Sequence, residues 1–459
     1  MVGSRLVPTS GILPHRALTT QTVTDDHIAE LAAKPLHPLT LTDLVKYGRP
    51  PLPASALYES ANFTLSILPA RLAHRIQSLR NLPFIVVSNP HISKIHNNYL
   101  HSLSTLLPWS EKQITNLEDE IKFTEVMADL VQTHSNTISI LARGFLEARK
   151  YISPVEVTRF LDEHLRARIG TRLIAEQHIA LHFSSQPHTE LSSDSKDHRH
   201  DSHGPDESHQ SSYIGVIDTD LHPASIIRHC EGTVGDICEL RYGVRPSVVI
   251  NGEPDYTFAH IPVHLEYIIT ELLKNAFRAT VERGMEREPI EVTIAPLPEG
   301  LSDHGREKGL TNQDQGNMNV AMSDVGKEQE AVSENIRPLK QSTPGVTIRM
   351  RDRGGGISPE NLAHIWDYSF TTFKEEELIS RQQSSSGGSA SIDALNAISG
   401  DAGGSSLAGL GYGLPLGRAY AEYFGGGIAV QSLWGWGTDV YLSLRGVGRV
   451  ECEGRRSGG

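Results

Sequence analysis

The chain has 459 residues, 38% of them apolar, and a formal net charge of −13. This length exceeds one ordinary hydrophobic core, so we expect two domains. The acidic balance argues against nucleic acid as the main partner, because proteins that bind the phosphate backbone are basic. No apolar run approaches the roughly 18 residues of a membrane-spanning helix. The cysteines, Cys230, Cys238 and Cys452, share no metal-type spacing, which fits a reducing compartment and predicts burial of the first two.

Residues 1–30 differ in composition from the rest of the chain. They contain Arg5, Arg16 and several hydroxyl side chains but no acid before Asp25, which is typical of a mitochondrial transit peptide. Pro8 and Pro14 weaken the amphipathic helix that such a peptide forms, so a disordered leader is the alternative. The transit-peptide interpretation predicts a mitochondrial protein.

Residues 31–186 follow the period of helices. Val131, Ile138, Phe145 and Ile152 recur every seven residues and mark an apolar stripe typical of one helix. Two other helical stretches carry inward-facing side chains at Leu161, Leu165, Ile169, Leu173 and Ile179, and at Leu68, Leu72, Ile76 and Leu79. This spacing predicts antiparallel helices packed as a bundle.

The composition changes after the helices. Residues 187–212 are polar and rich in histidine, and we expect a disordered loop. Its histidines could bind a metal only on a fixed scaffold. From 213 to 446 the chain mixes strands and helices, with insertions at 299–343 and 378–407, and 447–459 forms a tail. Strand patterns fall at 213–217, 247–251, 291–295, 346–352, 428–433 and 439–444.

The helix around ELLKNAFRAT combines an apolar and a polar face. Glu271 and Asn275 are four residues apart, so they share one face. An amide oxygen can help to hold Mg²⁺, and a carboxylate one turn away can accept a proton or orient a hydroxyl. Taken alone, the pair also fits a solvated helix face.

Two glycine-rich segments follow that are typical of nucleotide binding. Asp352 ends a strand and precedes three glycines, which let the backbone pass close to a ligand, and its carboxylate can accept a hydrogen bond from an amino group such as that of adenine. A tight turn is the simpler interpretation. Further on, glycines open a helix whose N-terminus favours phosphate. Thr438, in the closing hairpin, can point its hydroxyl into the same pocket.

The order of these elements resembles the GHKL (Bergerat) ATP-binding fold of gyrase, the ninety-kilodalton heat-shock chaperones, histidine kinases and MutL. The whole chain further resembles the mitochondrial kinases of 2-oxoacid dehydrogenase complexes. The resemblance lies in LPARLAHRIQSLRNLPFIVVSNPHI, RARIGTRLIAEQHIALH, ELLKNAFRAT, DRGGGI, YSFTT, GLGYGLPLGRAYAEYFGG and GTDVYLSL. It implies an α plus α/β protein, with a four-helix-bundle domain at 31–186 and a GHKL α/β sandwich with a mixed sheet at 213–446.

The resemblance also implies roles for individual residues. Glu271 would be the base that orients a target serine, and Asn275 would bind Mg²⁺ between the phosphates of ATP. Asp352 would accept a hydrogen bond from the adenine amino group. Other nucleotide contacts would come from Arg278, Gly356, Thr371, Thr372, Gly409, Gly411, Gly413, Leu414 and Thr438. A K⁺ site would match Ile365, Asp367, Phe370 and Gly411, and the stretch after Lys374 would be a lid over ATP.

The resemblance implies phosphorylation, and hence inactivation, of the E1 α subunit of a 2-oxoacid dehydrogenase in the mitochondrial matrix. It also implies docking to the lipoyl domain of the E2 core near residues 68–92, for which the bundle core is the simpler interpretation. It further implies a homodimer through the ATP-binding domain. Two departures from pyruvate dehydrogenase kinases favour the branched-chain branch. Tyr267 stands where those kinases have histidine, and their C-terminal Asp-Trp pair is missing. We leave the identity of the dehydrogenase open.

Three other functions are compatible with parts of the sequence. His74 lies in a helical stretch, as the phosphoacceptor of a histidine kinase does, but no acid follows it. A gyrase-type or MutL-type ATPase would need a transducer domain after Arg445. A non-catalytic regulator that binds ATP would not need both Glu271 and Asn275.

Overall fold

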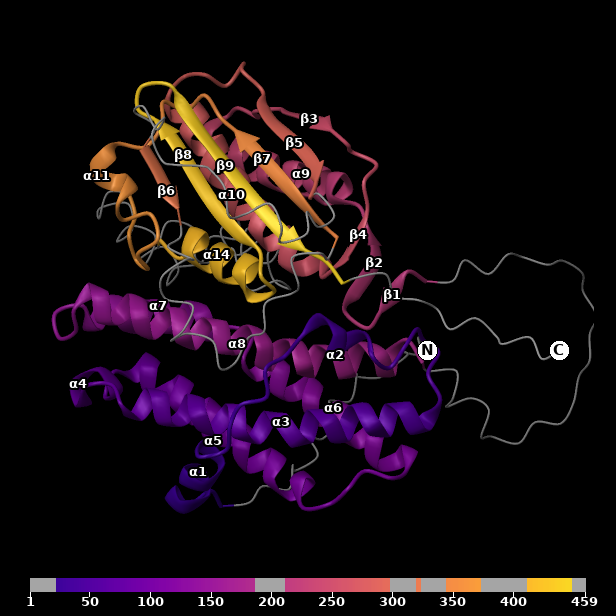
Figure 1. The fold of residues 1–459 in the computed structure, drawn as a ribbon. Helices are drawn as coiled ribbons and strands as arrows, with labels where there is room; N and C mark the ends of the chain where they lie inside the picture. Colours follow the sequence, from indigo (N-terminus) through magenta and orange to yellow (C-terminus); the bar gives the residue numbers. More distant parts are fainter. Residues whose placement is uncertain (1–21, 186–210, 298–318, 323–343, 373–410, 448–459) are drawn as a thin grey trace, which may run out of the picture.

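The computed structural model describes residues 22–185, 211–297, 319–322, 344–372 and 411–447. Figure 1 shows a helical part below and a sheet with packed helices above. Among these residues, no helix combines the length and the apolar character that crossing a membrane requires. The fold is therefore helical in its first half and mixed in its second, as predicted.

The helical part contains α1 to α8. Their bounds are Asp25–Ala32, Leu41–Val45, Ala54–Arg80, Phe84–Val87, Pro90–Ser110, Leu117–Thr133, Thr137–Ala148 and Pro154–Phe183. Local sequence sets where α8 begins, because Ser153 and Glu156 form a reciprocal capping box and Pro154 occupies the first turn. The long helices α3, α5, α6 and α8 pack on one another through buried aliphatic side chains.

The stripe from Val131 to Ile152 does not belong to one helix. Helix α6 ends at Thr133 and α7 begins at Thr137. Between them, the Thr137 hydroxyl donates to the His134 carbonyl at 2.9 Å, so a local side-chain bond replaces the helical ladder. Ile138 and Phe145 are still buried, because α7 turns back over α5.

A small sheet connects the two halves. Strands β1 (Tyr213–Ile214) and β2 (Ile217–Leu221) are antiparallel, and β4 (Phe258–His260) pairs with β2. The single strand predicted over 213–217 is thus wrong, because Gly215 turns the chain at φ +60°. Gln177 of α8 fixes this turn, accepting from Val216 N at 2.8 Å and donating to the Leu44 carbonyl at 2.7 Å.

The large sheet has the strand order β3-β5-β7-β9-β8-β6. Its strands are β3 (Val248–Gly252), β5 (Ile290–Pro296), β6 (Asn319–Met322), β7 (Gly345–Arg351), β8 (Gly427–Leu433) and β9 (Gly437–Arg445). β3 and β5 are parallel and the other pairs are antiparallel, so the sheet is mixed, as expected. On β5, β7 and β8 alternate apolar side chains are buried, which leaves a more polar face on the other side.

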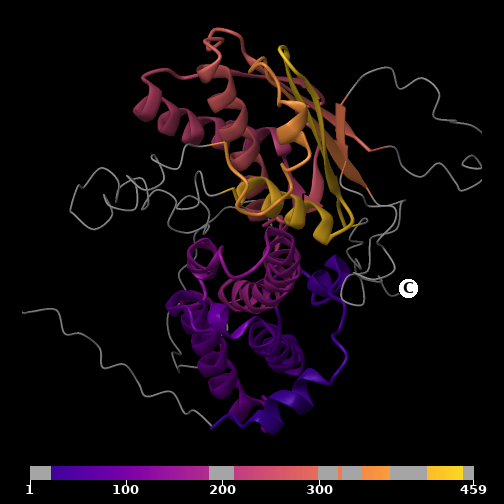
Figure 2. The same cartoon turned by 90° about the vertical axis from the view of Figure 1, so that its left-hand side faces the viewer.

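Three helices cover the buried face of the large sheet (Figure 2). They are α9 (Pro223–Tyr242), α10 (Pro262–Glu282) and α14 (Gly413–Tyr423), while α11 (Pro359–Leu362) is a single turn. Cys230 and Cys238 of α9 are buried against α10, as predicted. The two layers enclose an apolar core in which Leu265, Ile268 and Leu272 have at most 4% exposure.

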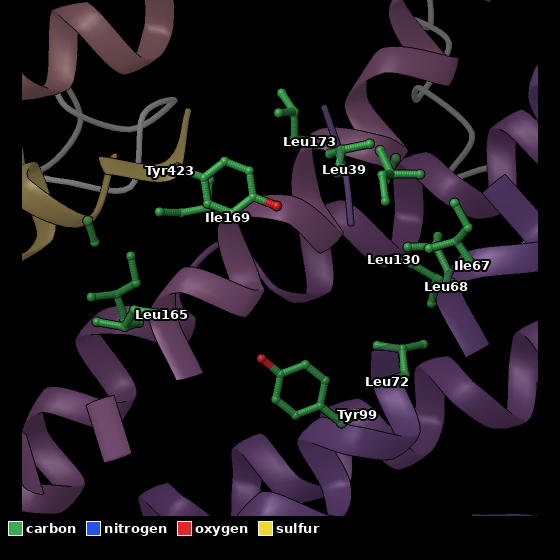
Figure 3. Packing of buried hydrophobic residues seen from close by; sticks show 14 of the residues in the cluster. Leu39, Ile67, Leu68, Leu72, Tyr99, Leu130, Leu165, Ile169, Leu173 and Tyr423 are labelled. Atoms are coloured by element: carbon green, nitrogen blue, oxygen red, sulfur yellow. The ribbon is translucent and has the colours of Figure 1, made fainter. Parts of the chain in front are cut away.

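Helix α14 also packs against α8 and so joins the two halves. Tyr423 lies beside Ile169 and Leu173 in the helical core (Figure 3). A Cβ at Gly170 would overlap the Tyr423 hydroxyl, so glycine is what permits this approach. Around this contact Arg166 and Arg418 pair with Asp162 and Glu422, and all four side chains are at least three-quarters buried.

Several predicted segments lie wholly or largely outside the described residues. These are the leader, the histidine-rich segment 187–212, the insertions 299–343 and 378–407, the lid, the tail 447–459, and the residues Gly409 and Cys452. Within the first insertion, only β6 is described.

Replacing Gly215 by alanine should destabilise the joint between the two halves. The new Cβ would overlap the carboxamide of Gln177, which is 3% exposed and held by hydrogen bonds. It would also sit at positive φ, which costs about 1 kcal/mol by itself. Together we expect a loss of about 2–3 kcal/mol in urea unfolding.

Gly284→Ala is the matched control, because Gly284 has φ +74° and nothing within 4 Å of its Cβ position. It should show only the backbone cost. Equal losses in the two variants would mean that the Gln177 contact contributes nothing.

Three buried histidines should make the fold sensitive to acid. Burial lowers the pKa of His178 and His260 to about 4 and that of His264 to about 3. Below pH 6.5 these histidines become protonated in the unfolded chain but stay neutral in the folded chain. The free energy of unfolding therefore falls between pH 6.5 and 4, by up to about 1.4 kcal/mol per pH unit for each histidine. Asp352 has the opposite effect on stability and offsets about one histidine. Burial raises its pKa to about 6, so the folded chain takes up this proton before the unfolded chain does.

Chemical unfolding at pH 7.0 and pH 5.0 measures the free energy of unfolding, which should be lower at pH 5.0. An equal or higher value at pH 5.0 would contradict this prediction.

Candidate active site

A cavity of about 490 Å³ lies between α10, the ends of β7 and β9, and the start of α14. It gathers side chains from segments more than 160 residues apart in the chain. The predicted site residues that line it are Glu271, Asn275, Arg278, Asp352, Gly356, Ile365, Phe370, Thr371, Thr372, Gly411, Gly413, Leu414 and Thr438. The sequence elements therefore meet in one place.

Helix α10 supplies the polar floor of this cavity. Its first turn begins with Pro262, and its apolar residues are buried under the sheet. The opposite side turns Glu271, Asn275 and Arg278 toward the cavity. The Arg278 guanidinium donates to Glu282 at 2.6 Å, which holds it along the helix surface.

Glu271 is 92% buried, and its carboxylate is held on two sides. The Lys274 ammonium donates to its Oε1 at 2.7 Å. A Cβ at Gly413 would overlap its Oε2, so the first residue of α14 must be small for the carboxylate to sit there. Glu271 thus lies where α10 and α14 meet.

Asp352 lies at the other end of the cavity. Its Oδ1 accepts from Gly354 N at 2.8 Å, and burial raises its pKa to about 6 although this bond favours the charged form. A buried carboxylate at this position costs free energy until a donor reaches it. This cost makes Asp352 suited to bind an amino group inside the cavity.

The glycines after Asp352 are required by close backbone contacts. Gly356 has φ +75°, and a Cβ there would overlap the Leu433 carbonyl. A Cβ at Gly354 would overlap Ala279 of α10. The loop is therefore pressed between α10 and the β8–β9 hairpin, and it leaves room for a planar ligand beside Asp352.

The structure does not place every predicted residue on the cavity wall. Asp367 turns its carboxylate to His364 at 2.8 Å instead, and its carbonyl accepts from Phe370 N. His74 lies in α3, where its ring contacts the Lys34 carbonyl at 3.2 Å, outside the cavity lining. Gly409 lies outside the described residues.

Comparison with known proteins identifies the family. Over 427 residues the chain is 30% identical to [Pyruvate dehydrogenase (acetyl-transferring)] kinase 1, mitochondrial, of Saccharomyces cerevisiae, covering 92% of this chain and 87% of that protein. The chain belongs to the mitochondrial 2-oxoacid dehydrogenase kinase family. It is 28% identical to the pyruvate dehydrogenase kinase of Arabidopsis thaliana (89% and 90% covered) and 24% identical to isozyme 4 of Rattus norvegicus (91% and 82%).

A family model described as "Mitochondrial branched-chain alpha-ketoacid dehydrogenase kinase" matches residues 38–218. The relatives carry the pyruvate name and the family model carries the branched-chain name. The comparisons therefore identify the kinase family and leave its two branches undivided. Membership in a kinase family implies ATP as the phosphoryl donor.

One residue of this cavity escaped the sequence reasoning. Lys274 lines the cavity and forms the ion pair with Glu271. The signal was present in ELLKNAFRAT, because residues three apart on a helix are neighbours. A lysine beside this carboxylate can hold it in place and can also attract phosphate.

Proposed function

We propose that this chain is an ATP-dependent protein serine kinase of the mitochondrial matrix. It phosphorylates and thereby inactivates the E1 α subunit of a 2-oxoacid dehydrogenase complex, either pyruvate or branched-chain. The main support is that Glu271, Asn275 and Asp352 line one cavity together with the glycine-rich start of α14. Family membership supports the reaction and the compartment.

The chain's residues fit ATP and Mg²⁺. Asp352 would accept a hydrogen bond from the adenine amino group, and Gly356 and Thr438 would line the base. Leu414 would lie with the neighbouring glycines around the phosphates. Asn275 would offer its amide oxygen to Mg²⁺, and that ion would neutralise the phosphates when bound. The phosphates would face Gly411 and Gly413, where α14 begins and its N–H groups are unpaired within the helix.

The serine hydroxyl would attack the γ-phosphorus while Glu271 accepts its proton. The oxygen–phosphorus bond to the serine forms, the bond to the β-phosphate oxygen breaks, and ADP leaves. The Lys274 ammonium holds the Glu271 carboxylate in place before the substrate arrives. The protein contributes positioning and charge, since phosphoryl transfer needs little covalent help.

A K⁺ site would lie beside the phosphates. Ile365, Phe370 and Gly411 line the cavity, and a Cβ at Gly411 would overlap the Phe370 carbonyl oxygen, so this oxygen lies beside Gly411. Asp367 would contribute through its carbonyl rather than through its carboxylate, which pairs with His364. Oxygen ligands of this kind suit a hard monovalent ion.

Two contacts with other proteins complete the proposal. The lipoyl domain of the E2 core would dock at the helical end around α4, where Phe84 is 86% exposed and Ile85 48% exposed. The buried members of residues 68–92 belong to the helical core instead, among them Leu68, Leu72 and Ile76. A second copy would join through the sheet domain, whose polar face carries no helix in the described part (Figure 2).

A transfer assay tests this function and separates the branches. Pyruvate and branched-chain dehydrogenase α subunits are offered side by side with ATP, each bound to its own core. We expect acid-stable phosphate on serine in at least one of them. Phosphate on histidine would point to the histidine-kinase alternative, and ATP binding without transfer would point to a non-catalytic regulator.

Asn275→Ala should abolish transfer and remove the effect of Mg²⁺ on nucleotide binding. Wild-type protein should bind ADP at least about tenfold tighter with Mg²⁺ than without it, since the ion links Asn275 to the phosphates. Calorimetric titration measures both affinities. Asn251→Ala, on exposed β3, is the control and should behave like wild type. A Mg²⁺ effect that survives in Asn275→Ala would refute this role.

Adenine nucleotide should bind more weakly in mild acid because of Asp352. Its pKa of about 6 means that the carboxylate is charged at pH 7.5 and largely protonated at pH 5.5. Protonation removes a charged acceptor, so we expect ADP affinity to fall about threefold to tenfold. In Asp352→Asn the side chain does not titrate, and only the pH dependence of the phosphates should remain. Equal pH dependence in both proteins would contradict this role.

A further inference from the structure

The hydroxyl of Tyr267 is a buried polar group that the proposed mechanism leaves unused. Tyr267 lies on α10 one turn before Glu271, so the two side chains are neighbours on the helix surface. It is 7% exposed, and its hydroxyl has no hydrogen-bond partner among the described residues. Leaving such a group unpaired costs free energy, so its presence calls for an explanation. A state in which the hydroxyl finds a partner would provide one.

Three helices fix the position of this phenol. Its ring lies 5.1 Å from that of Tyr420 on α14, and Tyr420 lies 4.6 Å from His264 on α10. Arg168 of α8 hydrogen-bonds the Tyr420 side chain. These contacts keep the Tyr267 ring from turning out to water. Any acceptor for its hydroxyl must therefore lie close by.

Glu271 is the acceptor that fits. Glu271 is about as buried as Tyr267, and its Oε1 accepts from the ammonium of Lys274. Burial raises the pKa of Tyr267 well above its usual value, and the negative charge of Glu271 raises it further. The phenol is thus a proton donor at neutral pH, beside a carboxylate that can only accept.

We propose that Tyr267 is a positioning residue whose hydroxyl donates a hydrogen bond to Glu271 when that carboxylate turns from Lys274 toward the substrate serine. Tyr267 keeps its proton throughout, and Glu271 remains the group that takes the serine proton. The inference rests on the proposed function, because it concerns the orientation of the base in that reaction. It also means that Arg168 and Tyr420 connect the helical half to the base.

The test compares full-length variants in the transfer assay with saturating and limiting ATP. Tyr267→Phe removes only the unpaired hydroxyl, so its thermal midpoint should match or exceed that of wild type. Its kcat should fall about tenfold while KM for ATP stays unchanged, since the bond forms only as the base turns. Tyr267→His keeps a donor at this position and should recover part of kcat.

Tyr256→Phe is the matched control. It also deletes a phenol hydroxyl, one that donates to the Gly345 carbonyl at 3.0 Å and lies outside the cavity lining. Its kcat should equal that of wild type. If wild type transfers phosphate and Tyr267→Phe has the same kcat, the inference is overturned and the proposed function is not. Equal losses in the phenylalanine and histidine variants also overturn it, because a donor would then be irrelevant. Wild type without transfer to any substrate overturns the proposed function, and this inference with it.

Discussion

The fold depends on the two-sided character of α10. Its apolar side, with Leu265, Ile268 and Leu272, fills the space between the helices and the large sheet. Its other side carries Glu271 and Asn275 into the cavity. Because burial of the first side fixes the rotation and depth of the helix, it also fixes where the second side points. Glu271 is then held 92% buried on a helix, without relying on a loop.

The contact between α8 and α14 makes the helical half part of the site. Helix α14 begins at Gly413, against Glu271, and ends at Tyr423, inside the helical core. One element of 11 residues therefore contacts both the carboxylate and the other domain. The ion pairs of Arg166 and Arg418 with Asp162 and Glu422 keep these helices in register, since each charge is buried and needs its partner. Any shift of α8 would reach the cavity through α14.

The errors of prediction have local physical causes. The seven-residue spacing from Val131 to Ile152 indicates buried residues but not chain continuity, and a bond from Thr137 to His134 breaks the helix within it. The apolar run at 213–217 reads as one strand, yet Gly215 folds it into a hairpin around Gln177, which is distant in sequence. β4 is only three residues long and has too little pattern to be recognised.

The sequence alone determined the helical and mixed halves, the buried face of α10, and the residue types expected at a nucleotide site, because periodicity and glycine spacing are local properties. It also indicated the family through motifs spread over both halves. Only the tertiary structure decided that Tyr267 is buried beside Tyr420, that Gly413 lies against the Glu271 carboxylate, and that Tyr423 packs against Gly170. Those facts depend on how α8, α10 and α14 pack together, and a linear pattern holds no record of contacts between residues more than 100 positions apart.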